Sequence, residues 1–142
     1  FRDVILLQTA PLLGVRESRQ IVGEYTLTAE DLSEGRKFDD SITNVTFNMD
    51  IHEPDSTSQS CLRTLPYQIP YRCLIPKKIN GLLVAGRCIS GTHEAMSSYR
   101  VTGNCTAIGE AAGYAAYEAI KQDKDLRYVE VHEILRHIDS CE

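Results

Sequence analysis

Hydrophobic and polar positions in the first third of the chain predict two strands with a short helix between them. Residues 19–27, RQIVGEYTL, alternate between two faces, as in a strand with one better-buried face. A helix of about two turns should follow, because Thr28 can cap its first amides and Gly35 can take the left-handed turn that ends it. Residues 44–52, NVTFNMDIH, alternate strictly and predict an antiparallel strand. Its inward positions would be Val45, Phe47, Met49 and Ile51.

The middle of the chain changes character twice. Residues 53–60, EPDSTSQS, are rich in turn-forming residues and predict a surface loop. In residues 65–76, LPYQIPYRCLIP, three prolines remove amide donors, which predicts an irregular path across a surface. The continuous apolar run INGLLVAGR, at 79–87, predicts a strand buried on both faces and hence parallel α/β structure.

A long helix is predicted from Gly103 onward, and a second amphipathic helix is predicted around 131–138, VHEILRHI. The long helix has small residues on a broad face, which should pack closely against its neighbour. The expected packed rows are Ala107, Ala111, Ala115 and Ala119, with Ile108, Ala112, Ala116 and Ile120 beside them. The expected outward residues are Glu110, Tyr117, Glu118 and Lys121.

Composition and charge narrow the classes of function. The 142 residues fit one domain, and a net charge of −5 leaves no extended basic surface for nucleic acid. No apolar run approaches the roughly 20 residues of a membrane-spanning helix, and the first ten residues lack a signal-peptide pattern. We therefore expect a soluble, cytoplasmic protein of α+β class, with no nucleic-acid or membrane partner.

Cysteine and histidine spacing gives no support for a metal site. The five cysteines form no C-x-x-C pair, so we expect buried free thiols. The residues four after His93 and His132 are Ser97 and Arg136, so neither forms the H-E-x-x-H pair of zinc hydrolases. No phosphate-binding P-loop and no G-x-G-x-x-G motif is present.

One segment contains candidate functional residues. It consists of an apolar run that ends at Gly86 and Arg87, a connection containing His93 and Arg100, and the helix start at Gly103. A helix N-terminus presents unpaired amides with partial positive charge, and glycine lets a flat ligand approach the backbone. An anion or an electron-rich ring edge could bind there. The alternative is that the glycine and the alanines only permit tight helix packing.

Four segments resemble the C-terminal part of the FAD-dependent oxidoreductase family, flavoproteins with a glutathione-reductase-like fold. They are GVRESRQIVGEYTLTAEDL, IPYRCLIP, GLLVAGRCISGTHEAMSSYRV and AIGEAAGYAA, and the resemblance covers roughly residues 9–138. It implies a fragment of an FAD/NAD(P)-binding α/β fold, in which a strand–loop–helix unit returns to the flavin. Gly86 and Arg87 would lie beside the ribityl and pyrophosphate region. Thr102, Gly103 and Asn104 would face the flavin pyrimidine edge, where amides stabilise negative charge.

Two further residues are candidates for catalysis. The segment SYRVTGN resembles the N-R-[LI]-G-G-N segment of fumarate reductase and succinate dehydrogenase flavoproteins, which implies that Arg100 binds a substrate carboxylate. Thr102 and Tyr99 depart from that pattern. His93 could transfer a proton, since an imidazole takes both forms near neutral pH, or it could be purely structural. Arg16, Glu17 and Arg19 could line the substrate side or form ion pairs.

The sequence therefore predicts a fragment of a flavin-dependent oxidoreductase that passes a hydride or electron pair between an organic substrate and FAD. We expect residues 1–80 to be a β-rich substrate-side segment, 81–124 the FAD-returning unit and 125–142 a closing helix. The expected partner is an N-terminal dinucleotide-binding part of the same parent, without which the fragment would hold no FAD and be inactive. A homo-oligomer is compatible with the sequence. The alternative is a non-catalytic interaction or structural module.

Overall fold

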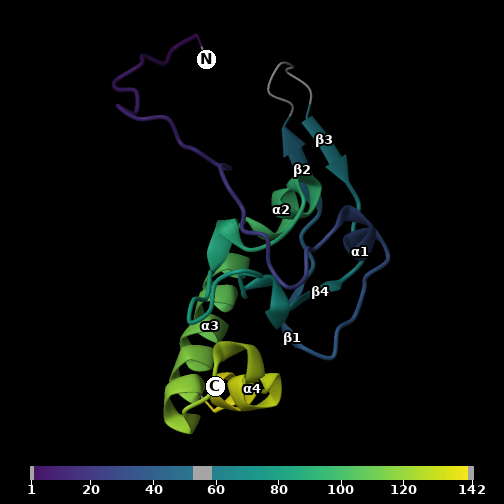
Figure 1. Cartoon of the computed structure of the whole chain (residues 1–142). Coiled ribbons are helices and arrows are strands. Elements are labelled where there is room, and N and C mark those ends of the chain that lie inside the picture. Colours follow the sequence, from purple (N-terminus) through teal and green to yellow (C-terminus); the bar gives the residue numbers. More distant parts are fainter. Residues whose placement is uncertain (1, 53–58, 141–142) are drawn as a thin grey trace.

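The computed structural model describes residues 2–52 and 59–140 (Figure 1). A short helix and two small antiparallel strand pairs come first, and the larger helices follow. The helices are α1 (Ala29–Ser33), α2 (His93–Tyr99), α3 (Thr102–Gln122) and α4 (Val131–Asp139), with 3-10 turns η1 (Tyr71–Cys73), η2 (Gly86–Cys88) and η3 (Leu126–Tyr128). The strands are β1 (Ser41–Val45), β2 (Met49–His52), β3 (Gln59–Leu62) and β4 (Tyr67–Pro70). This mixture of helices and strands is an α+β arrangement, as the sequence predicted.

The predicted strand over 44–52 is divided between two sheets. β1 pairs with β4, and β2 pairs with β3, so the chain changes partner around Phe47. The Phe47 carbonyl accepts hydrogen bonds from Ser98 and Thr64 rather than from a strand, which explains the break. Val45, Met49 and Ile51 point inward as predicted, whereas the Phe47 side chain is 44% exposed. Of the predicted 53–60 loop, residues 53–58 lie outside the described part, and Gln59 and Ser60 begin β3.

Two predicted strands do not form. Residues 19–27 run extended but make only isolated bridges, Gly23 to Pro76 and Leu27 to Gly91. In the run at 79–87, Leu82 is 44% exposed. The Val84 amide donates a hydrogen bond to the Leu74 carbonyl, but this bond is not part of a ladder between two strands. A strand buried on both faces needs hydrogen-bonded neighbours. The described residues place none beside this run, so the predicted parallel α/β structure does not form.

The proline-rich segment begins on the surface at Leu65 and Pro66 but lies largely in the core from Tyr67 to Pro76, which corrects the prediction of a surface path for that part. Prolines limit β4 to four residues, but they leave its inward side chains free to pack. Tyr67, Ile69, Cys73 and Leu74 are fully buried. The Tyr67 hydroxyl lies 2.8 Å from the Ser98 hydroxyl, which joins this segment to α2.

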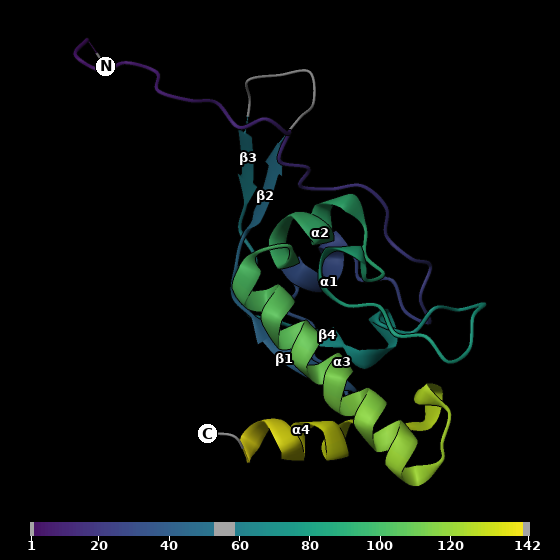
Figure 2. The same cartoon turned by 90° about the vertical axis from the view of Figure 1, so that its left-hand side faces the viewer.

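The helices agree with the prediction more closely. Thr28 caps α1 in a capping box with Asp31, and Gly35 has a φ of +63° just beyond the helix end. Figure 2 shows α3 crossing the β1–β4 pair, with α4 at its C-terminal end. Ile108, Ala111, Ala115 and Ala119 are buried as predicted, and so are Val131 and Ile134 of α4.

Two positions of α3 differ from the prediction. Ile120, expected in the packed face, is 83% exposed, whereas Glu118, expected outside, is only 3% exposed. The Glu118 carboxylate accepts hydrogen bonds from Lys121, Gln122 and His137, which offset the cost of burying its charge. These partners come from α3 itself and from α4, so helical periodicity could not indicate them.

Four cysteines are described, and all are free thiols. Cys73 is buried as predicted, but Cys61 and Cys88 are exposed, so the prediction of burial is wrong for both. Burial raises the pKa of the Cys73 thiol to about 12, which keeps it protonated. Over the helices that the structure describes, none has both the length and the apolar character to cross a membrane.

Candidate functional site

The N-terminus of α3 is an open cationic end of a long helix. Its N-cap residue, Val101, has extended backbone geometry but no side chain that can accept a hydrogen bond. The first bond inside the helix runs from the Cys105 amide to the Val101 carbonyl, so the earlier amides depend on another partner. An added Cβ at Gly103 would meet nothing within 4 Å, so the space beside this residue is open. The amides and the helix dipole favour an anion here.

Arginine side chains from distant segments gather at this helix end. Arg16, Arg87 and Arg100 line a pocket of about 250 Å³ together with Val101 and Thr102. An adjoining pocket of about 360 Å³ is lined by Gly86, Arg87, Arg100, Thr102, Cys105 and Thr106. Among the described residues, the carboxylate of Asp50 pairs with Arg16 at 3.3 Å, and no carboxylate pairs with Arg87 or Arg100. Within the part of the chain that the structure describes, Arg87 and Arg100 therefore bring positive charge to the two pockets without a direct ion pair to a carboxylate.

Arg100 follows directly after α2, where it caps the end of that helix. Its Nη2 donates to the backbone carbonyl of Asp50 at 2.7 Å, while its Nε is buried without a hydrogen-bond partner. Burial lowers the pKa of the guanidinium, and the charge of Arg16 lowers it further. Arginine nevertheless stays charged in proteins. An unpaired buried donor is costly, so an oxyanion near Nε would relieve a real deficit.

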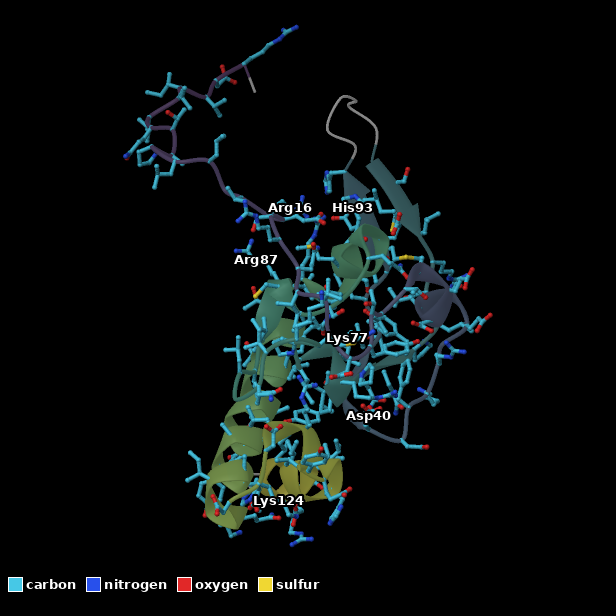
Figure 3. The ribbon with its side chains drawn as sticks, in the orientation of Figure 1. Arg16, Asp40, Lys77, Arg87, His93 and Lys124 are labelled. Atoms are coloured by element: carbon cyan, nitrogen blue, oxygen red, sulfur yellow. The ribbon has the colours of Figure 1, made fainter. Side chains whose placement is uncertain are left out.

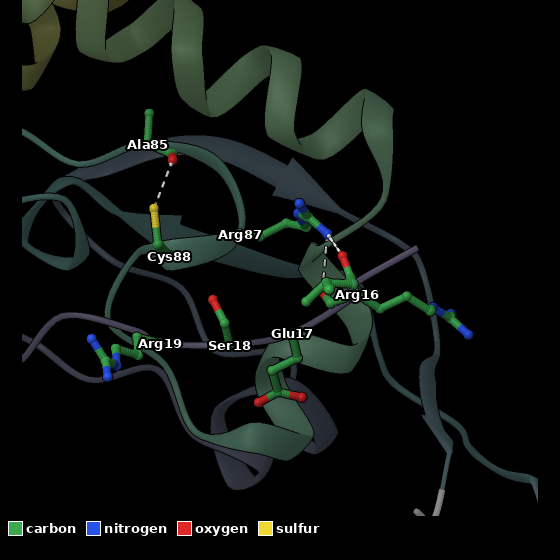
Figure 4. Close-up of a pocket in the computed structure, with 8 residues that line it drawn as sticks. Arg16, Glu17, Ser18, Arg19, Ala85, Arg87 and Cys88 are labelled. Carbon is green, nitrogen blue, oxygen red and sulfur yellow. Dashed lines mark hydrogen bonds between the residues drawn. The ribbon is translucent and has the colours of Figure 1, made fainter. Parts of the chain in front are cut away.

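Gly86 and Arg87 also line the larger of the two pockets. Gly86 has a φ of +79°, a conformation that favours glycine, and it turns the chain from the apolar run into η2. Arg87 Nη1 donates to the carbonyls of Val15 and Arg16 at 2.6 and 3.3 Å (Figure 4). These bonds attach the N-terminal segment to the pocket. They also orient the guanidinium without neutralising its charge.

His93 lies at the start of α2 and contacts the same N-terminal segment. Its Nδ1 is 2.7 Å from Glu17 Oε2, and the Gln20 amide donates to Glu17 Oε1 at 3.0 Å. Partial burial raises the pKa of Glu17, but the hydrogen bonds from Gln20 and His93, with the charge of Arg100, bring it below its ordinary value. Figure 3 shows His93, Arg16 and Arg87 in the same part of the molecule, far from Lys124.

The structure brings most of the predicted site residues together. Gly86, Arg87, Arg100 and Thr102 line one pocket, and Gly103 follows Thr102 at the helix end. Asn104 is directed elsewhere, because its side-chain amide lies 3.5 Å from the Ser98 carbonyl and so contacts α2. The sequence left Arg16, Glu17 and Arg19 open as lining residues or ion pairs. Arg16 and Glu17 do form ion pairs, with Asp50 and His93, and all three residues line a pocket of about 330 Å³. The sequence analysis missed Gln20, which only the spacing Glu17-x-x-Gln20 could have indicated.

Comparison with known proteins identifies the family of this chain. An arginine-lined helix N-terminus is a site for an anionic or electron-rich ligand in general. The family model described as FAD dependent oxidoreductase matches residues 1–138, which is nearly the whole chain. The chain therefore belongs to the FAD dependent oxidoreductase family. No curated protein and no solved structure matches it.

Proposed function

We propose that this chain supplies the flavin-ring environment of an FAD-dependent oxidoreductase that acts on an organic substrate. The observation that carries the proposal is the α3 N-terminus, where uncapped amides meet the guanidinium groups of Arg87 and Arg100, neither of which forms an ion pair with a described carboxylate. FAD, when bound, supplies two-electron redox chemistry. The open space beside Gly103 and the unpartnered Nε of Arg100 support the fit of an electron-rich ring edge here.

The site residues divide into two roles. Thr102 and Gly103 would offer backbone amides to the pyrimidine edge of the flavin, and Gly86 and Arg87 would hold the ribityl and pyrophosphate side. Arg100 and Arg16 face the smaller pocket, where they would hold a negatively charged group of the substrate. This arrangement retains residues 1–80 as the substrate side, 81–124 as the flavin-binding unit and 125–142 as the closing helix.

The exposed apolar run around Leu82 supports the proposal that this chain is one part of a larger fold. We propose that it becomes a strand of a parallel sheet when a dinucleotide-binding part with a G-x-G-x-x-G motif packs beside it. Ile79 and Leu82 are 54% and 44% exposed, and Ile120 on the nearby helix is 83% exposed. Covering these side chains would remove apolar surface from water.

The test is a titration of the isotope-labelled chain with riboflavin, which carries the isoalloxazine ring without the ADP half. We expect the largest NMR shift changes at the amides of Thr102 and Gly103. Gly103→Val should abolish them, because the new side chain occupies the approach to the helix end. Gly109→Val is the matched control, since Gly109 is another α3 glycine with open surroundings. Shift changes that avoid these amides, or that survive Gly103→Val, would overturn the proposal.

A further inference from the structure

We propose that His93 is the proton-transfer group of this site and that Glu17, held by Gln20, is its positioning residue. This inference rests on the proposed function, because it assigns a proton acceptor to the oxidation of a substrate by FAD. It depends on side-chain geometry that neither the family match nor the arginine cluster specifies. Its three residues come from two segments, Glu17 and Gln20 from the N-terminal part and His93 from α2.

Both oxygens of the Glu17 carboxylate have a polar partner. Oε2 lies 2.7 Å from His93 Nδ1, and Oε1 accepts a hydrogen bond from the Gln20 amide at 3.0 Å. A carboxylate can only accept, so a contact of 2.7 Å favours the neutral imidazole with its proton on Nδ1. The lone pair is then on Nε2, which no other described residue engages. A base oriented by a second group, which is itself oriented by a third, is the usual arrangement of an acid–base site.

The position of the pair relates it to the arginine pocket. Arg16 lines that pocket, Glu17 is the next residue, and Arg87 holds the backbone of Val15 and Arg16. Glu17 and Arg87 also line a further pocket of about 330 Å³ (Figure 4). Glu17 therefore lies next to the space in which Arg100 would hold a substrate anion, close enough for the charge of Arg100 to lower its pKa, and His93 contacts Glu17 at 2.7 Å. By contrast, an exposed ion pair that lies far from any pocket would contribute only a little to the stability of the protein.

The proton-transfer step balances without any further reagent. An O–H or N–H bond of the substrate breaks, and its proton forms a new bond to His93 Nε2, so the imidazole becomes a cation that Glu17 stabilises. The hydrogen and electron pair that leave the neighbouring carbon would be accepted by FAD, the oxidant that the proposed function supplies. The reverse direction returns the proton from His93 to the product.

The primary experiment measures the tautomer of His93 in the folded chain by ¹⁵N NMR of its ring nitrogens at a pH where the ring is neutral. We expect the proton on Nδ1 in the unsubstituted chain and in Glu17→Gln, because an amide oxygen still accepts. Glu17→Leu should shift the proton to Nε2, which isolated imidazole side chains prefer. A proton on Nε2 in the unsubstituted chain, or no change in Glu17→Leu, would overturn the inference. The result requires no flavin, so it is independent of the riboflavin titration.

A kinetic experiment on the FAD-loaded, natural-length protein tests the catalytic role. General acid–base groups typically contribute about 10²–10⁴-fold. We expect His93→Gln to slow flavin bleaching by substrate by that order, and Glu17→Leu to slow it while Glu17→Gln retains more of the rate. His132→Gln is the control, because His132 is an exposed residue of α4. Unchanged bleaching in His93→Gln with normal flavin content would overturn the inference while leaving the proposed function intact.

Discussion

At the scale of single residues, the structure depends on a few polar groups whose partners come from other elements. Asp31 is 1% exposed, yet it accepts hydrogen bonds from Thr28, Tyr25 and Arg36. The α1 capping box could be predicted from the spacing of Thr28 and Asp31. The contacts from Tyr25 and Arg36 could not, because they depend on how the preceding and following segments fold around α1.

Glu118 provides a prediction about pH. Hydrogen bonds from His137, Gln122 and Lys121 lower the pKa of its carboxyl to about 2, against an unfolded value of about 4.3. A lowered folded pKa stabilises the protein fully above the unfolded value, and this contribution is lost as pH falls from about 4.3 towards about 2. We therefore expect Glu118→Gln to reduce the free energy of unfolding at pH 6 and to flatten its fall between about pH 5 and 2.

Chemical denaturation at a series of pH values measures this effect. Glu110→Gln is the control, because Glu110 is an exposed carboxylate on the same helix. An acid dependence in Glu118→Gln as steep as that of the unsubstituted chain would show that the buried carboxylate is not responsible.

At the scale of elements, close packing between segments decides what the backbone tolerates. Gly23 is buried in the bridge to Pro76, and an added Cβ there would lie 2.7 Å from Ser90 Cβ and 3.1 Å from the Arg72 carbonyl. Gly109 lies in the interior of α3, where an added Cβ would meet nothing within 4 Å. Two glycines that look alike in the sequence therefore have opposite structural constraints.

The two glycines give a paired prediction. Gly23→Ala should lower the free energy of unfolding by about 1–3 kcal/mol, because backbone and Cβ atoms cannot move aside easily. Gly109→Ala should raise it by about 0.5–1 kcal/mol, since alanine favours the helix more than glycine does. Urea denaturation followed by circular dichroism measures both changes. A neutral Gly23→Ala would mean that the extended 19–27 segment is packed less tightly than the structure indicates.

At the scale of the whole molecule, a large amount of apolar surface remains uncovered. The N-terminal segment extends away from the body in both views (Figures 1 and 2). Its exposed apolar residues are Val4, Ile5, Leu6, Leu7, Leu12, Leu13 and Val15. Contiguous apolar surface of this kind favours association with another chain or with a further part of the same protein.

We expect the 142-residue chain to associate with itself when it is studied alone. Its molar mass measured by light scattering should rise with concentration, and Leu6→Asp with Leu13→Asp should shift it towards the monomer. Both side chains are more than 80% exposed, at 81% and 93%, so these changes should leave the folded body intact. Leu6→Ile with Leu13→Ile is the control that keeps the apolar character. A monomer at all concentrations with cooperative unfolding would instead favour a self-sufficient, non-catalytic module.

Sequence patterns predicted three of the four described helices, because helical periodicity and capping are local. They missed α2 (His93–Tyr99), which forms where a connection containing His93 was expected. α1, α3 and α4 form where Thr28, Gly103 and the VHEILRHI segment indicated them. The strands were predicted poorly, since a strand exists only where another segment offers hydrogen bonds. The apolar run at 79–87 has the composition of a buried strand, but the described residues place no strand partner beside it.

The candidate site shows the same division. The sequence by itself determined the glycine at the turn into η2, the small-residue helix that begins at Thr102, and the resemblance to flavoproteins that the family match supports. Only the tertiary structure decided that Arg16, Arg87 and Arg100 meet at one helix end and that Glu17 contacts His93. The physical reason is that local backbone preferences are encoded in neighbouring residues. A charge cluster instead depends on how segments more than 70 residues apart pack together, as the bonds from Arg87 to Val15 and Arg16 illustrate.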